Sequence, residues 1–200
     1  IVMAERHDIK PIICINKIDL VDVVQLQSVA AMYGRLGYQV VLTSIKTGCG
    51  IDHLRQLLQN RQTALSGQSG VGKSSLLNVV DSTLNLDTSD VSDSSSKGTH
   101  TTRRARLLPL TQGGWVADTP GIRQFELWDI SMEEIDGYFI EFCPFISYCQ
   151  FSSCSHTHEA SCGVKRGVEA NLIHRSRYES YLRIREEDIF LWKNPARGQS

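Results

Sequence analysis

A glycine-rich turn between an apolar strand and an apolar helix sets the fold class of this chain. Residues 63–80 read TALSGQSGVGKSSLLNVV, with the spacing G-x-x-x-x-G-K-S from Gly67 to Ser74. Glycines let backbone N–H groups turn inward around phosphate oxygens without a clashing Cβ, and the helix that follows directs its partly positive N-terminus at the same anion. The sequence therefore predicts a phosphate-binding loop on an α/β sheet.

The side chains of this turn have distinct expected roles. Lys73 would reach the β- and γ-phosphates of a nucleotide and assist catalysis there, and the Ser74 hydroxyl would ligate Mg²⁺. An ordinary glycine turn before a helix is the alternative, and the correct flanks count against it. The predicted nucleotide-binding residues of the turn are Gly67, Gln68, Ser69, Gly70, Val71, Gly72, Lys73, Ser74 and Ser75.

An apolar strand upstream of this turn, over residues 11–15, ends in the polar loop Asn16-Lys17-Ile18-Asp19. N-K-x-D at the end of a parallel strand is the guanine-reading pattern. The Asp19 carboxylate can accept hydrogen bonds from both guanine N1–H and the exocyclic N2 amine, and adenine offers no such pair. Asn16 and Lys17 would brace the loop and cover the base. A polar turn after a strand is the plainer alternative for this pattern on its own.

A second polar loop, Ser44-Ile45-Lys46, follows a strand expected over residues 38–43. S-x-K at such a strand end resembles the loop whose backbone N–H meets guanine O6, so Ser44 and Lys46 join the predicted nucleotide-binding residues. Open α/β sheets bind ligands at the carboxyl ends of their strands, so these loops should converge on one nucleotide, GTP or GDP. An ATPase is the alternative.

Residues 81–99, after the helix of the phosphate loop, are rich in Ser, Asp and Thr and predict a mobile loop. A threonine that follows such a loop can close over the γ-phosphate and Mg²⁺. Thr101 and Thr102 both fit this role, and Thr102 is preferred. The basic residues Arg103, Arg104 and Arg106 come next, as an RNA or phosphate contact or as a solvated strand edge.

An expected strand pair, over residues 107–110 and 115–117, delivers the sequence Asp118-Thr119-Pro120-Gly121. The Asp118 carboxylate would hold Mg²⁺ through water, and the Gly121 N–H would meet the γ-phosphate. Many GTPases then place a glutamine that orients the attacking water, but this chain has Ile122. We therefore expect slow intrinsic hydrolysis, with His100 as the candidate catalytic side chain or as a loop residue that contacts a partner or solvent.

The composition is that of an ordinary globular protein, with a formal net charge of −1 and no apolar run long enough to span a bilayer. Whole-molecule charge therefore implies no nucleic-acid partner. Because the sequence begins at Ile1 rather than Met, it is expected to be a fragment.

Four of the six cysteines lie within twenty residues near the C-terminal end, together with histidines. This clustering favours a metal and a reducing compartment over a disulfide framework. Three thiolates and one imidazole suit a tetrahedral structural Zn²⁺. Cys143 and His158 compete as ligands, and buried free cysteines are the alternative to any metal. The proposed zinc ligands are Cys149, Cys154, His156 and Cys162.

Residues 171–192 predict an amphipathic helix in which basic residues interleave with tyrosines. Such a surface could grip rRNA phosphates, and a solvated helix face is the equally weighted alternative. The basic residues in question are Lys165, Arg166, Arg175, Arg177, Arg183 and Arg185. The tail after this helix, NPARGQS, is expected to be disordered.

The order of the loops is permuted, because N-K-x-D and S-x-K precede the phosphate loop instead of following it. This order, the G-T-H-T-T sequence from Gly98 to Thr102 and the cysteine cluster together resemble the RsgA (YjeQ) family of circularly permuted, ribosome-dependent GTPases. The segment after Asp118–Gly121 then leads directly into the cysteine-rich end, so movement of one can be passed to the other.

The resemblance implies an α/β P-loop GTPase fold over 1–136 and a zinc-binding helical domain over 137–200, with the family's N-terminal OB-fold missing. It implies hydrolysis of GTP to GDP and phosphate, stimulated by the small (30S) ribosomal subunit and its rRNA during late maturation. The family's zinc spacing matches the four ligands above. We further expect a cytoplasmic monomer without a membrane, or an organellar one if the source is a plant. A conventional sheet has a strand that this order would place before Ile1, so a central strand should be lacking.

Other function classes remain open from the sequence. One is an RNA-binding module in which GTP is only a conformational ligand. Another is a zinc-finger-like interaction protein with a vestigial nucleotide site.

Overall fold

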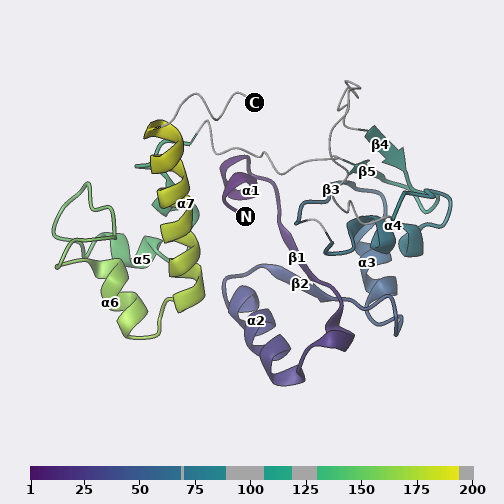
Figure 1. Ribbon diagram of the computed structural model, residues 1–200, viewed down its shortest axis with the longest axis horizontal. Coiled ribbons are helices and arrows are strands. Elements are labelled where there is room, and N and C mark those ends of the chain that lie inside the picture. Colours follow the sequence, from purple (N-terminus) through teal and green to yellow (C-terminus); the bar gives the residue numbers. More distant parts are fainter. Residues whose placement is uncertain (69, 89–105, 119–129, 194–200) are drawn as a thin grey trace. The chain divides into compact units, whose positions relative to one another are not determined.

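The structure is a computed structural model that describes residues 1–68, 70–88, 106–118 and 130–193. The chain divides into two compact units (Figure 1). The sheet unit comprises Ile12–Phe125, and the helical unit comprises Ile1–Pro11 together with Glu126–Ser200. The predicted division into 1–136 and 137–200 differs from these units in where it puts residues 1–11 and 126–136, and it stays a prediction.

The sheet unit begins with a β-α-β arrangement. Strand β1 (Ile12–Ile15) pairs in parallel with β2 (Gln39–Leu42), and the 3-10 helix η1 (Ile18–Leu20) and helix α2 (Val23–Arg35) connect them. The Asp22 carboxylate caps α2 by accepting a 2.7 Å hydrogen bond from the Val24 N–H. The two strands predicted from the sequence are therefore present, and β1 ends where the N-K-x-D loop begins.

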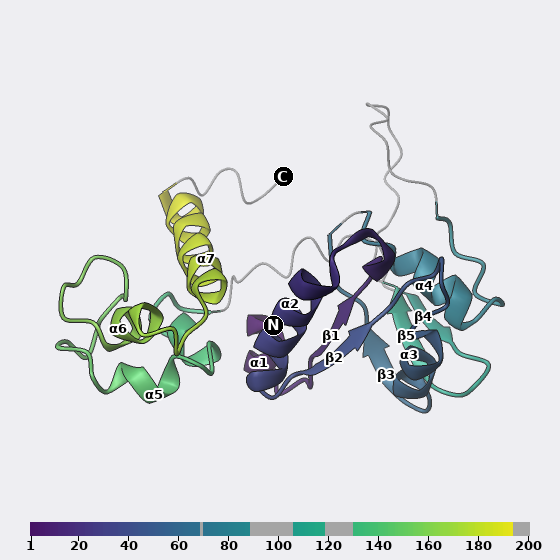
Figure 2. The same ribbon diagram turned by 90° about the horizontal axis from the view of Figure 1, so that it is seen from below.

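A second sheet holds the glycine-rich turn. Strand β3 (Gln62–Ala64) pairs in parallel with β5 (Trp115–Asp118), and β5 pairs antiparallel with β4 (Arg106–Pro109) (Figure 2). Helices α3 (Ile51–Leu58) and α4 (Lys73–Val80) pack with these strands around one core. That core consists of Val41, Ile51, Leu54, Leu58, Leu76, Leu77, Val80, Leu110 and Val116. This core holds the two helices on the strands beside the glycine-rich turn.

The two sheets of this unit are separate. One has the order β1-β2 and the other the order β3-β5-β4, and no strand within residues 1–68, 70–88, 106–118 and 130–193 pairs β1 with β3. The expectation that a central strand of a conventional sheet is lacking stays a prediction.

The start of the loop predicted over 81–99 is anchored, which corrects the expectation that it is mobile from its first residue. The side chain of Asn78 donates to the Leu86 carbonyl and accepts from the Leu86 N–H, both at 2.8 Å. Leu84 and Leu86 pack against the core of the sheet unit. These two leucines are the apolar content that a reading of overall polarity overlooks. Residues 89–99 lie outside the described residues.

Asp81 ties this anchored segment to the β4–β5 turn. One carboxylate oxygen accepts from the N–H and the hydroxyl of Thr83, and the other accepts from the N–H and the hydroxyl of Thr111 at 2.6 and 2.9 Å. Asp81 is only 4% exposed. The backbone hydrogen bond from Thr111, with the others, lowers the pKa of Asp81 to about 2.

We expect Asp81→Asn to lower the free energy of unfolding by about 2 kcal/mol at pH 7. The amide NH₂ of the asparagine would face the N–H and hydroxyl donors of either Thr83 or Thr111, which then lose their acceptor. The pKa of Asp81 is lower in the folded state than its unfolded value of about 4, so the carboxylate stabilises the fold at a pH above about 4. This contribution is lost as the pH falls toward the folded pKa of about 2. The difference between wild type and variant in urea unfolding should therefore shrink between pH 4 and pH 2. The exposed Asp87→Asn is the control, and a difference independent of pH would contradict this role.

The helical unit has its own core. Helix α1 (Val2–Arg6) packs on the 3-10 helix η3 (Ile135–Tyr138), and α5 (Cys143–Ile146) packs on α6 (Gly163–Glu169). Helix α7 (Arg175–Lys193) completes the unit (Figure 1). The fully buried large side chains of the helical unit include Ile135, Phe139, Phe142, Ile173 and Tyr181. The N-terminal helix thus belongs to the core of the cysteine-rich end.

The basic face predicted for α7 needs correction at Arg177. This side chain is buried, and its guanidinium donates to both carboxylate oxygens of the equally buried Glu141, at 2.5 and 3.2 Å. It also lies 4.6 Å from the centroid of the Phe139 ring. Arg177 is therefore part of the core and does not offer its charge to a phosphate.

Across the described residues, no helix combines the length and apolar character that crossing a bilayer requires.

Candidate nucleotide site and metal site

The loop after β1 and the glycine-rich turn lie against each other, although they are more than fifty residues apart in the sequence. The Asn16 side-chain amide donates to the Val71 carbonyl at 2.9 Å. The Lys17 ammonium donates to the Gly70 carbonyl at 2.8 Å. The predicted guanine loop and the predicted phosphate loop therefore meet at one place, so a single nucleotide can touch both.

Asn16 is held in place from two sides. The buried Thr43 hydroxyl donates to Asn16 Oδ1 at 3.0 Å, which leaves the amide nitrogen directed at the glycine-rich turn. Gly72 has a φ of +94°, and a Cβ there would lie 2.7 Å from Asn16 Nδ2. Only glycine accommodates both the backbone conformation and the close approach of this side chain.

The third loop supports Asp19. The Ser44 hydroxyl, which is buried, donates to Asp19 Oδ1 at 2.5 Å and accepts from the Thr47 N–H at 3.2 Å. The hydrogen bond from Ser44 lowers the pKa of Asp19, so the carboxylate is ionised at neutral pH. An ionised carboxylate is an acceptor only, which matches the two N–H donors of guanine. Lys46 lies exposed on the same loop.

The phosphate loop closes on its own lysine. The Lys73 ammonium donates to the carbonyls of Gly67 and Gln68, at 2.6 and 2.9 Å. Helix α4 begins at Lys73, and its N-cap residue Gly72 has no side chain to cap the first turn. Uncapped N–H groups at a helix N-terminus form an anion site, and the half-buried Ser74 and Ser75 stand in that first turn.

Of the predicted nucleotide-site residues after the glycine-rich turn, only Asp118 lies within the described residues. Asp118 ends β5, which runs parallel to β3, so its backbone stands at the same end of the sheet as the start of the glycine-rich turn. The predicted nucleotide-site residues that lie outside the described residues are Ser69, His100, Thr101, Thr102 and Gly121.

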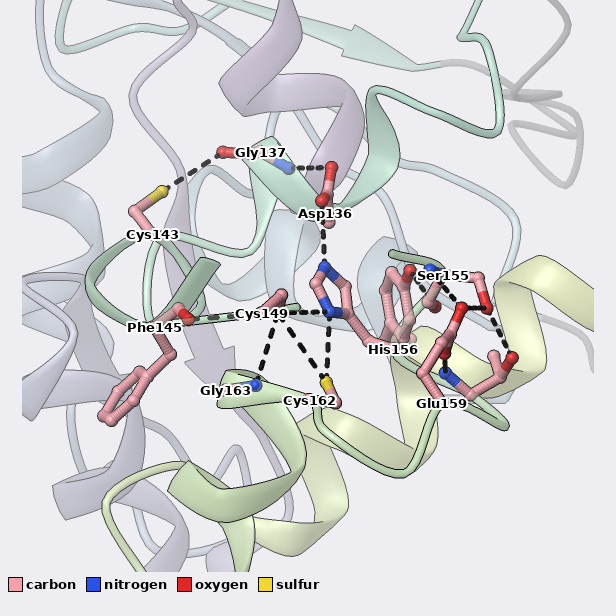
Figure 3. A network of polar contacts seen from close by, with 12 residues as sticks. Asp136, Gly137, Cys143, Phe145, Cys149, Ser155, His156, Glu159, Cys162 and Gly163 are labelled. Carbon is pink, nitrogen blue, oxygen red and sulfur yellow. Dashed lines mark hydrogen bonds and ion pairs between the residues drawn. The ribbon is translucent and has the colours of Figure 1, made fainter. Parts of the chain in front are cut away.

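In the helical unit, the structure brings together the four predicted metal ligands. One ligand atom from each of Cys149, Cys154, His156 and Cys162 lies within 4.8 Å of the others. His156 Nδ1 is 3.6 Å from Cys149 Sγ and 3.3 Å from Cys162 Sγ (Figure 3). His156 and Cys162 are fully buried. This set of soft donors, within reach of one ion, fits a tetrahedral Zn²⁺.

Three thiols in so small a space affect one another's ionisation. Burial, with the neighbouring sulfurs, raises the pKa of Cys154 to about 12 and raises the pKa of Cys162. Burial opposes ionisation of Cys149 too, but backbone N–H donors from Gly163 and Val164 outweigh it and lower the pKa of that thiol. The cluster therefore favours a bound cation, which offsets the repulsion between adjacent thiolates.

The competing ligand candidates stand apart from this cluster. Cys143 is exposed, and its thiol faces the Gly137 carbonyl at 3.7 Å. The His158 side chain is 85% exposed and lies 3.9 Å from Glu159.

Three residues that support the loop over 149–162, which carries the four candidate ligands, have no signal in the sequence pattern. The Tyr178 hydroxyl donates to the His156 carbonyl at 2.6 Å, and the Tyr181 hydroxyl donates to the Ser155 carbonyl at 2.9 Å. The Asp136 carboxylate contacts His156 Nε2 at 3.0 Å. The sequence pattern predicts both tyrosines on a basic surface, and the spacing of Asp136 from the ligands does not distinguish it from other acidic residues.

Comparison with known proteins decides the family. The family model described as RsgA GTPase matches residues 1–128. The chain belongs to the RsgA GTPase family. A small ribosomal subunit biogenesis GTPase RsgA from Caldanaerobacter subterraneus is 42% identical over 187 residues, which cover 94% of this chain and 63% of that protein. Its counterpart from Gemmatimonas aurantiaca is 46% identical, with 94% and 61% covered.

RsgA-type proteins of known structure are similar as well. The crystal structure of YjeQ from Thermotoga maritima matches with a TM-score of 0.74 and 40% identity, covering 93% of this chain and 62% of that one. YloQ, described as a circularly permuted GTPase, matches with a TM-score of 0.69 and 36% identity, covering 93% and 59%. The fold is therefore the mixed α/β fold of these RsgA-family GTPases. The chain spans less than two thirds of the length of these relatives.

Proposed function

We propose that the protein binds GTP and hydrolyses it to GDP and phosphate. The observation that carries this proposal is the pair of hydrogen bonds from Asn16 and Lys17 to the carbonyls of Val71 and Gly70, which join the guanine loop to the phosphate loop. In this arrangement Asp19, supported by Ser44, reads the N1–H and N2 amine of guanine.

The phosphates would lie in the Gly67–Ser74 turn. A γ-phosphate would replace the carbonyls of Gly67 and Gln68 as partner of the Lys73 ammonium, which is already directed into the turn. The Mg²⁺ ligands in this proposal are Ser74, Thr102 (with Thr101 as the alternative) and Asp118, and Gly121 would meet the γ-phosphate. Mg²⁺, when bound, neutralises the charge that develops on the phosphate oxygens.

The proposed partner is the small ribosomal subunit with its rRNA, which the relatives' names support. On the helical unit, Arg166, Arg175 and Arg183 remain exposed and can meet phosphates, whereas Arg177 is buried. Because Ile122 cannot orient water, the subunit would supply the stimulation, with His100 as the candidate side chain on this chain. We also propose that the protein acts as a monomer in the cytoplasm.

In the helical unit we propose one structural Zn²⁺, held by the four-residue cluster of Cys149, Cys154, His156 and Cys162. The coordination would be closed, with three thiolates and one imidazole and no position left for a substrate. Its role would be to fix the 149–162 loop on α6 and α7. We also propose the division of the chain into a GTPase domain over 1–136 and a zinc-binding domain over 137–200.

The test is phosphate release with and without purified small ribosomal subunits. We expect slow release by the protein alone, stimulation of at least about tenfold by the subunits, and loss of both in Lys73→Ala, because the ammonium stabilises charge on the transferred phosphoryl group. Lys10→Ala, an exposed lysine of the helical unit, is the matched control. GTP binding without stimulation would favour the alternative in which GTP is only a conformational ligand, and no binding at micromolar GTP would overturn the proposal.

A further inference from the structure

The buried histidine of the metal cluster uses both of its ring nitrogens. Its Nδ1 faces the sulfurs of Cys149 and Cys162, at 3.6 and 3.3 Å, and its Nε2 faces the carboxylate of Asp136 at 3.0 Å (Figure 3). The His156 side chain is 1% exposed, so no water competes for either position from the bulk. A neutral imidazole carries one proton, and the carboxylate can only accept. The proton therefore belongs on Nε2.

The carboxylate is itself held in place. Asp136 Oδ1 accepts a 2.9 Å hydrogen bond from the Gly137 N–H, which leaves Oδ2 directed at the histidine. Asp136 lies on η3, beside the fully buried Ile135. The ring of His156 is also bounded by Phe142 and Tyr181, with centroids 6.1 Å away in both cases. The ring orientation is thus set by the core of the helical unit and by one carboxylate.

We propose that Asp136 is the positioning residue of the metal site. By accepting the proton of Nε2, it fixes the tautomer that presents the Nδ1 lone pair to a Zn²⁺ ion, and it makes that nitrogen a stronger ligand. Asp136 does not touch the ion, and it stands 13 residues before the first ligand, Cys149. It connects the metal loop to η3, on which α1 packs.

This inference rests on the proposed zinc site, and affinity measured by competition with a chelator of known strength tests it. We expect Asp136→Ala to weaken zinc binding by about 10- to 100-fold, as loss of a carboxylate behind a ligating histidine does elsewhere. Asp136→Asn should lie between wild type and Asp136→Ala, because its amide oxygen can still accept from Nε2–H but carries no charge. Glu133→Gln, an exposed carboxylate three residues earlier, is the matched control and should bind as wild type does.

A spectroscopic measurement separates positioning from a general loss of stability. In the zinc-bound wild type, two-bond ¹H–¹⁵N correlations should show His156 Nε2 protonated and Nδ1 bound to metal. In Asp136→Asn, which preserves the shape of the side chain, the Nε2 resonance should shift while the helical circular dichroism stays that of the wild type. If Asp136→Ala does not fold, this variant still decides the question.

Two results have different consequences. A wild-type chain that holds no zinc would overturn the metal site and this inference with it. One zinc in the wild type, together with affinities of both Asp136 variants within twofold of wild type or with Nε2 as the metal ligand, would overturn only the role of Asp136.

Discussion

Asp19→Asn should lower the affinity for GTP roughly a thousandfold and create binding of xanthosine triphosphate. The carboxylate of Asp19 accepts from two N–H groups of guanine, and an asparagine would set its NH₂ against the N2 amine. Xanthine carries a carbonyl oxygen at that position, so the same NH₂ finds an acceptor. Competition of GTP, xanthosine triphosphate and ATP against a fluorescent guanine nucleotide measures this exchange.

The control for this experiment is Asp22→Asn, three residues away. Asp22 caps α2 through the Val24 N–H, and asparagine caps a helix as well as aspartate does. Its GTP affinity should equal that of wild type. Loss of GTP binding in Asp19→Asn without any gain of xanthosine triphosphate binding would mean that Asp19 only supports the loop through Ser44, and unchanged GTP binding would remove Asp19 from the site.

Removal of the metal should unfold the helical unit and leave the sheet unit folded. The 149–162 loop presents few apolar side chains of its own, and two tyrosine hydroxyls of α7 reach its backbone at Ser155 and His156. Structural zinc contributes about 10 kcal/mol or more to folding of small domains. Cys162→Ala, which removes a fully buried ligand, should therefore abolish zinc retention and lower the free energy of unfolding of this unit by more than about 4 kcal/mol.

Zinc content, the loss of helical circular dichroism and GTP binding together measure this outcome. Cys143→Ala is the matched control, because that thiol is exposed and outside the cluster. GTP binding should survive in both variants, since the guanine and phosphate loops lie in the sheet unit. Full zinc retention in Cys162→Ala would contradict the assignment of this ligand.

The elements around the nucleotide loops were predictable because short-range patterns determine them. An apolar run followed by a polar loop placed β1 and the Asn16–Asp19 loop, and the glycine spacing placed α4. The convergence of these loops followed from the rule that ligands bind at strand ends. The metal cluster was predictable for the same reason, since its four ligands lie within fourteen residues of one another.

Long-range partners of buried polar groups were not predictable. Arg177 pairs with Glu141 across 36 residues and Asp81 binds Thr111 across 30, and no local pattern distinguishes such residues from exposed ones of the same type. Asp136 was missed for this reason, because its partner His156 lies twenty residues away. The anchoring of Leu86 by Asn78 was missed because overall polarity hid two leucines.

The placement of Ile1–Pro11 in the helical unit means that the backbone crosses between the units twice, once at residues 11–12 and again at residues 125–126. A cut at either crossing leaves the two units covalently joined through the other one, and the packing of Val2 in the helical core holds the first eleven residues in place. Deleting everything after residue 125 would strand α1, because Val2 packs in a core made by residues from the far end of the chain. Dissection of this protein into separately expressed units thus requires two breaks in the chain and the return of its first eleven residues to the helical unit.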